Sequence, residues 1–477
     1  MRRVQRGAGI SEAELRAIEK AKGARFQRDG DKQLWRTQIE QVDGSHDLDE
    51  LAAAGLTQLL RLVSPTWLQA EAQKAYRLES TFLTNPLHLV NGCRVGVGPA
   101  QEGPQRLARM LLVTQDHLDK RWDLDFFSAA LLVPEGAVLG NSLSEIRALG
   151  PEAERKLAAL PRMTDEEVSA TIYELLVGAA CVRNGRSITM VPEDRSRKVP
   201  DFCLSDLGPL TGAIECKRRL GLTVYELAEA RYVEALYGPV RTQLRDRGIH
   251  GSLEACFTVP LGSVQVAEFS EAVLAIVDDR AHEVGSTQTR WGSLAFRPHR
   301  QLRAIQKTRL YSPDYLQEAF DWDPLQDQWD GLLCEVDPVP NIRVELITRP
   351  LCLKWRSETE EALTKKARGV TSLWANAARQ IPDGEIGFIY IAYPEGARPT
   401  LADARTRHIL STASNDFFHR WSVRIPAMVV TRLYARALGV GVPDLIENAM
   451  AGSTNGEEFW FEQLPGRVFT EPISPQA

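Results

Sequence analysis

The sequence has no hydrophobic run long enough to cross a membrane. A transmembrane helix needs about 20 predominantly apolar residues, and the best candidate, FFSAALLVPEGAVLG (126–140), is interrupted by Pro134 and Glu135. The basic N-terminus, MRRVQRGAGISEAEL, is not followed by the apolar region of a secretory signal. We therefore expect a cytoplasmic protein that does not bind a membrane.

The sequence also has no clustered metal-binding residues. Its seven cysteines are scattered without a CxxC pair, and its eight histidines occur singly. This pattern argues against a disulfide framework, a zinc site and an iron–sulfur cluster, and favours free thiols. The G-x-x-x-x-G-K-[ST], G-x-S-x-G and H-E-x-x-H motifs are absent as well, so P-loop ATP binding, serine-hydrolase chemistry and zinc-protease chemistry are not expected.

The charge balance does not indicate a strongly basic protein. The net charge is −6, but residues 180–310 contain 19 Lys/Arg and 15 Asp/Glu, a local excess of +4 that leaves −10 for the remainder. This distribution is compatible with a basic cleft on an acidic body, which is one way for an enzyme to meet phosphate groups.

Hydrophobic periodicity divides the chain into three regions. We expect residues 1–160 to be a mostly helical, regulatory or interaction region, with helices over 51–63 and 104–122. A further N-terminal helix would begin at a capping box formed by Ser11 and Glu14.

Residues 161–265 have the pattern of a compact α/β core. Thr164 and Glu167 form a capping box before the apolar helical stretch 168–182. Strands, a helix and a closing strand are then expected in the order 186–191, 199–205, 211–217, 222–244 and 251–259. The predicted order is α-β-β-β-α-β within about 100 residues.

Residues 266–477 are expected to form a C-terminal α/β region. The stretch 287–340 has little periodicity and predicts an insertion or a linker. Residues 343–355 predict a strand, Ser357 with Glu360 predicts the start of a helix, and two further strands are expected over 385–393 and 424–433.

Two acids and a lysine stand out in the predicted strands of the core. Asp201 and Glu215 lie in neighbouring strands, where an unpaired carboxylate is costly to bury. Glu215 and Lys217 share a strand face because they are two residues apart, and the backbone carbonyl of Cys216 lies between them. Carboxylate and carbonyl oxygens are ligands that Mg²⁺ prefers. These groups could form a metal site with an ammonium at its rim.

This arrangement resembles the PD-(D/E)xK nuclease superfamily, which has the restriction-endonuclease-like fold. The resemblance rests on Pro200-Asp201 and, after a 13-residue gap, Glu215-Cys216-Lys217, in a strand–turn–strand context. It covers roughly residues 164–260. It implies an α/β protein with an αβββαβ core of this fold, flanked by the helical N-terminal and α/β C-terminal regions.

The resemblance also implies roles for individual residues. Asp201, Glu215 and the Cys216 carbonyl would bind Mg²⁺ or Mn²⁺, and Lys217 would position water or stabilise developing charge. The helix before the strands often carries a glutamate in this superfamily, and Glu174 is the one charged residue in 168–182. Glu174 would assist the metal or the geometry of the site.

The activity implied is metal-dependent hydrolysis of phosphodiester bonds, with DNA favoured over RNA and a 5′-phosphate on the product. An unregulated nuclease would endanger the cell, so we expect a protein partner, a homo-oligomer or a trigger. By analogy, a role in bacterial antiviral defence or restriction fits this expectation.

Other interpretations remain open. A catalytically inactive module with the same fold would bind nucleic acid or scaffold a complex without cutting, and an assembly protein would carry the motif by chance. Asp201 would then belong to an ordinary Pro-Asp turn, Glu215 and Lys217 to an exposed ion pair, and Glu174 to a solvent-facing position. Arg218 and Arg219 contact either phosphates or solvent. Some nucleases of this superfamily place a glutamine of a later helix near the site, and by this resemblance Gln380 would lie there.

Overall fold

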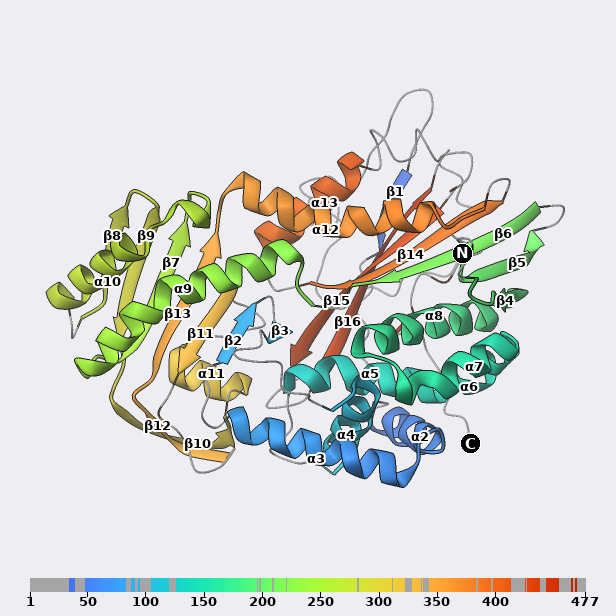
Figure 1. The fold of residues 1–477 in the computed structure, drawn as a ribbon, viewed down its shortest axis with the longest axis horizontal. Helices are drawn as coiled ribbons and strands as arrows, with labels where there is room; N and C mark the ends of the chain where they lie inside the picture. The colour runs from blue at the N-terminus through green and yellow to red at the C-terminus, as the bar shows by residue number, and fades with distance from the viewer. Residues whose placement is uncertain are drawn as a thin grey trace, which may run out of the picture.

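The computed structural model shows a mixed α/β protein with two large sheets (Figure 1). It describes residues 34–38, 48–82, 87–90, 93–94, 104–119, 126–194, 196, 199–207, 210–219, 221–280, 283–310, 312–321, 328–335, 337, 343–382, 385–395, 398–412, 425, 427–437, 443–453, 465 and 468–469. The expected helix at Ser11 lies outside these residues. No helix in the described ranges is long and apolar enough to cross a membrane.

The first large sheet, sheet A, contains the strands with the candidate site. Its strands follow the order β1 (Leu34–Gln38), β16 (Pro443–Ser453), β15 (Ala427–Ala437), β14 (Ile386–Pro394), β6 (Leu210–Arg218), β5 (Phe202–Leu207) and β4 (Ile188–Met190). β14 runs parallel to both β6 and β15, and the other pairs are antiparallel. Sheet A is therefore mixed, with β6 between an antiparallel and a parallel neighbour.

The second large sheet, sheet B, lies beside sheet A (Figure 1). Its strands follow the order β3 (Cys93–Arg94), β2 (Leu87–Val90), β11 (Gly331–Glu335), β13 (Leu351–Ser357), β7 (Gly251–Phe257), β9 (Gly292–Pro298) and β8 (Gly285–Thr289). A separate two-stranded ribbon pairs β10 (Leu302–Arg309) with β12 (Arg343–Thr348). Only β7 and β13 are parallel among the described pairs of sheet B.

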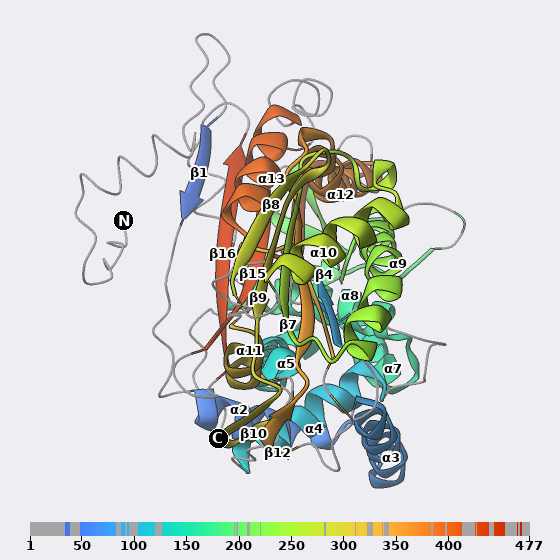
Figure 2. The same cartoon turned by 90° about the vertical axis from the view of Figure 1, so that its left-hand side faces the viewer.

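Helices cover both faces of each large sheet. The helices are α2 (Leu48–Leu60), α3 (Pro65–Phe82), α4 (Arg106–Leu118), α5 (Phe126–Asn141), α6 (Leu143–Ala148), α7 (Pro151–Ala159), α8 (Asp165–Arg183), α9 (Val224–Asp246), α10 (Val266–Arg280), α11 (Pro313–Phe320), α12 (Glu360–Ala378) and α13 (Pro399–Thr412), with 3₁₀ turns at Leu160–Arg162 and Leu261–Ser263. On sheet A, α5 and α8 lie on one face and α12 on the other. Figure 2 shows α12 and α13 at the opposite end of the molecule from α2, α3 and α4.

Local sequence signals explain where the principal helices begin. Thr164 and Glu167 form the predicted capping box of α8, and Thr223 forms another with Glu226 at α9. The predicted apolar face of α12, formed by Leu363, Ala367, Val370, Trp374, Ala377 and Ile381, is buried throughout. The N-cap of α12 is Thr359 rather than the predicted Ser357, because the Thr359 hydroxyl accepts from the Ala362 N–H. The described part of residues 1–160 is mostly helical, as expected.

The chain leaves sheet A after β6 and returns to it only with β14. Helix α9 carries the chain from β6 to β7 of sheet B, and α12 carries it back from β13 to β14. The expectation that the strand 251–259 closes the αβββαβ core is therefore wrong: β7 pairs with β13 and β9 in sheet B. The parallel partner of β6 is β14. The αβββαβ order is therefore formed by α8, β4, β5, β6, α12 and β14, and residues 224–357 are inserted between β6 and α12.

The structure also decides two other expectations. Of the two alternatives for the stretch 287–340, the structure favours an insertion over a linker: its described residues contribute to β8, form β9, β10, α11 and β11, and lie within the inserted residues 224–357. Residues 343–355 do not form one strand, because the chain turns between β12 and β13 at Arg349, whose φ is +49°. These two strands belong to different sheets, so their continuous apolar pattern conceals a break.

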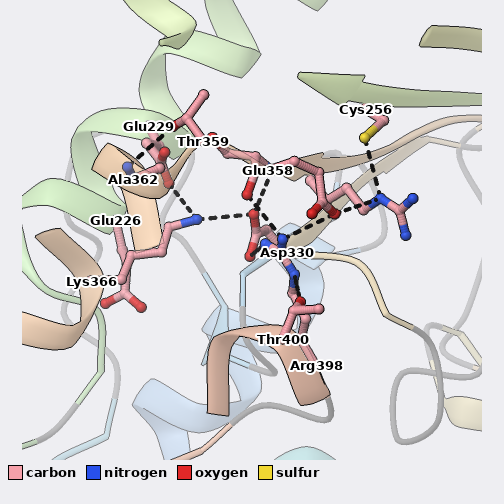
Figure 3. Close-up of polar contacts among 12 residues, drawn as sticks. Glu226, Glu229, Cys256, Asp330, Glu358, Thr359, Ala362, Lys366, Arg398 and Thr400 are labelled. Carbon is pink, nitrogen blue, oxygen red and sulfur yellow. Dashed lines mark hydrogen bonds and ion pairs between the residues drawn. The ribbon is translucent and has the colours of Figure 1, made fainter. Parts of the chain in front are cut away.

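A buried ion cluster links α9 and α12 to the ends of sheet B strands (Figure 3). Lys366 Nζ lies 2.9 Å from Asp330 Oδ2 and 2.8 Å from Glu229 Oε2. Arg398 pairs with Asp330 at 2.5 Å and with Glu358 at 3.2 Å. The cluster joins α9, α12 and the segments that flank β11, β13 and α13. Because the pairs compensate charges removed from water, loss of one partner would be costly.

Candidate active site

Asp201 lies one residue before β5, beside the end of β6. Phe202 pairs with Ile214, so the same antiparallel register places Pro200 opposite Cys216. Proline has no N–H to donate to β6, and the Cys216 N–H donates to Asp201 Oδ2 at 2.7 Å. The N–H and C=O of a strand residue point to the same side. The Cys216 carbonyl therefore points toward Asp201 and receives no ladder hydrogen bond from Pro200.

Glu215 and Lys217 occupy the face of sheet A that α12 covers. Their parallel neighbours Ile389 and Ile391 belong to the core beneath α12, and neighbours in register share a face. Glu215 Oε1 is ion-paired with Lys217 Nζ; the Glu215 side chain is fully buried and that of Lys217 is 25% exposed. No described residue hydrogen-bonds to the buried Glu215 Oε2. A buried oxygen without a donor is costly, so a bound cation would stabilise this atom.

Glu174 reaches the same site from α8. Gly178, one turn later, allows α8 to lie close to β5, since a Cβ there would be 2.6 Å from Leu149 Cδ1 and 2.8 Å from Phe202 Cε1. Phe202 directly follows Asp201, and the close approach keeps Glu174 near that carboxylate. The Glu174 side chain is 14% exposed, so the solvent-facing interpretation is wrong.

Lys156 of α7 is a site residue that the sequence analysis missed. Its Nζ lies 2.7 Å from Glu174 Oε2 and 3.2 Å from Glu193 Oε1, and its side chain is 6% exposed. No pattern in the sequence identifies it, because a buried lysine and an exposed one look alike in a charged helix. The structure therefore gathers three buried carboxyl groups, those of Glu174, Asp201 and Glu215, and two ammonium groups at one place.

The three carboxyl groups share a strongly perturbed environment. Burial, reinforced by the charge of Glu215, raises the pKa of Asp201 to about 7. Burial likewise raises the pKa of Glu174 to about 7, with Asp201 adding to the effect and Lys156 opposing it. Burial also raises the pKa of Glu215 to about 7 although Lys217 opposes it. Clustered, perturbed carboxyl groups are typical of catalytic and metal sites.

The residues present fit a hard divalent ion held partly by water. Within the described ranges, no three His, Cys, Asp or Glu side chains are grouped so that they could hold a metal ion by themselves. Mg²⁺, however, needs only one or two protein carboxylates, because it keeps several waters and binds substrate phosphate. Asp201, the unpartnered Oε2 of Glu215 and the Cys216 carbonyl offer such a partial set of oxygens.

The arginines that follow the motif do not line the site. Arg218 NH2 donates to Glu135 Oε2 at 2.8 Å and only 3% of its side chain is exposed. Arg219 lies 3.8 Å from Glu226 Oε2 and stacks over the Tyr393 ring. The sequence predicts that these arginines contact either phosphate or solvent. Both predictions are wrong, because each arginine lies beside a buried glutamate.

Gln380 lies next to the segment that leads into the site. Its Nε2 is 3.5 Å from the Val199 carbonyl oxygen, two residues before Asp201. The end of α12 therefore reaches the edge of the carboxylate cluster.

No protein-family model matches the chain, and no curated protein matches it either.

Proposed function

We propose that the protein is a metal-dependent nuclease that hydrolyses phosphodiester bonds, with DNA as the favoured substrate. The arrangement of sheet A supports this proposal, because α8, β4, β5, β6, α12 and β14 follow the αβββαβ order of a restriction-endonuclease-like core. The insertion of residues 224–357 is compatible with that order, since the chain leaves sheet A after β6 and returns to it with β14, directly after α12.

One observation carries the proposal. The end of β6 combines a backbone carbonyl facing Asp201 with a fully buried Glu215 whose Oε2 has no partner among the described residues. A solvated surface ion pair would expose both partners, and an ordinary Pro-Asp turn would not surround its carboxylate with two further buried acids. The arrangement favours a site for a cation over either structural interpretation.

The residues divide the chemistry among them. Asp201, Glu215 and the Cys216 carbonyl would hold Mg²⁺ or Mn²⁺, with Glu174 shaping the site from α8. The ion, when bound, supplies a positive charge that polarises the phosphate and acidifies water. Lys217, whose ammonium is partly exposed, would orient the attacking water or stabilise charge on the phosphate. Hydrolysis breaks the bond between phosphorus and the 3′ oxygen and leaves the phosphate on the 5′ end.

A cleavage assay with matched variants tests this proposal. The protein is incubated with plasmid, single-stranded DNA and RNA, with Mg²⁺, Mn²⁺ or EDTA. We expect metal-dependent cleavage of DNA that Glu215→Gln and Lys217→Met each reduce at least 100-fold, the order of a lost catalytic group. Arg61→Met is the control, because Arg61 is exposed and lies outside both sheet A and α12. Cleavage by Glu215→Gln at the unaltered rate would disprove the site.

A catalytically inactive module is the second candidate. It is favoured by the absence, in the part of the chain that is described, of a complete three-ligand side-chain group, and by the pairing of Lys156 with Glu174. This candidate predicts nucleic-acid binding without cleavage under every metal condition, and binding that Glu215→Gln leaves unchanged apart from a small gain in affinity.

A further inference from the structure

The outward face of α12 has an unusual distribution of charge. Its exposed residues recur at helical spacing, and after Glu361 they are Lys365, Arg368, Ser372, Ala375, Asn376 and, at the C-cap, Arg379. The sequence from 362 to 380 contains no Asp or Glu. We call Lys365, Arg368 and Arg379 the α12 cation row. Basic and small polar residues on one helix face suit a polyanion better than an apolar partner.

The cations of this row are available to bind a ligand. Within the described ranges, no ion pair with a carboxylate involves Arg368 or Arg379. Among the residues that the structure describes, Arg379 donates within its own helix, to the Ala375 carbonyl at 2.8 Å and to Asn376. Lys365 pairs with Glu361 one turn away, and an exposed pair of this kind contributes only about 0.5 kcal/mol. A phosphate could displace it easily.

The neighbouring helix leaves this face basic. Arg368 lies close enough to His408 of α13 to help lower the pKa of that imidazole, for which burial is the larger cause. The exposed charged residues of α13 are Asp403 and Arg407, whose opposite charges cancel. The excess positive charge of the surface therefore comes from α12.

The α12 cation row runs toward the candidate active site. The end of α12 lies beside Val199, just before Asp201, and Glu215 and Lys217 occupy the sheet face that this helix covers. From Lys365 to Arg379 the helix advances about 21 Å at a rise of 1.5 Å per residue. Each strand of duplex DNA presents a phosphate about every 3.4 Å of the axis, so one backbone offers several phosphates along the length of the row.

We propose that the α12 cation row is the surface along which the phosphate backbone of duplex DNA lies as it enters the site. This inference rests on the proposed function for its choice of ligand. The row reads no bases, so its contribution is electrostatic, independent of sequence and sensitive to salt.

The test measures binding in the absence of cleavage. A fluorescent 30-bp duplex is titrated with the full-length protein in EDTA at several salt concentrations between about 50 and 200 mM. Arg368→Gln/Arg379→Gln removes two charges from the row. Arg61→Gln/Arg300→Gln is the matched control, since both residues are exposed, lie off α12 and change the net charge equally.

The expected result is a change in the salt dependence. Each lost phosphate contact lowers the slope of log K against log salt by about 0.9, so the row variant should lose about 1.8 and bind roughly tenfold more weakly. The control should change by less than half as much. Equal slopes for the two double variants, or no duplex binding by the unaltered protein, would overturn the inference. If the row variant shows the expected slope change but the unaltered protein cleaves no DNA with any metal, the α12 cation row still binds DNA and the proposed nuclease activity is rejected.

Discussion

Asp201→Asn should make the metal-free protein more stable at alkaline pH. The unfolded chain loses the Asp201 proton near the ordinary pKa of 3.8, whereas the folded protein loses it near 7. Between these values the native state binds more protons than the unfolded state, so this carboxyl lowers stability as pH rises through the interval. The penalty is complete above pH 7. Asparagine removes the charge and can still accept the hydrogen bond from Cys216.

The size of the effect follows from the difference between the two pKa values. At about 1.4 kcal/mol per unit of pKa, the full penalty is about 4 kcal/mol, and about half of it is already present at pH 5.5. Unfolding entropy near 2.1 cal/mol/K per residue gives about 1 kcal/mol/K for 477 residues. The variant should therefore melt about 4 °C higher at pH 8.5 and about 2 °C higher at pH 5.5.

Thermal melts of both proteins in EDTA at the two pH values provide the measurement. Added Mg²⁺ should narrow the difference at pH 8.5, because a bound cation stabilises the ionised carboxylate of the unaltered protein but not the amide. Thr164→Ala, which removes a helix cap, is the control and should lower the melting temperature by a similar amount at both pH values. An Asp201→Asn variant less stable than the unaltered protein at pH 8.5 would refute the conclusion that the ionised Asp201 carboxylate destabilises the fold.

Two other substitutions probe buried lysines. Lys156→Met removes a partner that opposes the raised pKa of Glu174, so the pH midpoint of Mg²⁺ stabilisation, followed by melting temperature, should rise; an unchanged midpoint would count against their coupling. Lys366→Met leaves Glu229 buried without its cation and should lower the melting temperature by about 3–5 °C, whereas Lys365→Met should change it by less than about 1 °C; equal effects would show that the ion cluster adds no stability.

Local signals predicted individual elements well but not their partners. The capping box at Thr164 fixes the start of α8, and the alternation around Glu215 predicts β6. The pairing of β6 with β14 joins segments about 170 residues apart, and no periodicity encodes which of two apolar strands, β7 or β14, lies beside it. The break at Arg349 was missed because its flanking strands are both apolar.

The candidate site shows the same division. Asp201, Glu215 and Lys217 were predicted to meet because they occupy consecutive strands, and the structure brings them together. Lys156 was not predicted, since its approach to Glu174 depends on how α7 packs against α8. Arg218 and Arg219 look like phosphate ligands in the sequence. The structure instead pairs Arg218 with Glu135 of α5, 83 residues away, and places Arg219 beside Glu226 in the first turn of α9.

The excursion of the chain into sheet B also sets an order of events during synthesis. A ribosome adding about 5–20 residues per second needs roughly 10–30 s to proceed from the end of β6 to the start of β14, residues 218 and 386. Throughout that delay the strand bearing Glu215 has one open edge and no α12 above it. A nascent chain cannot complete the surroundings of the site until α12 and β14 have been made, and a truncation at residue 265 should leave β6 exposed to aggregation.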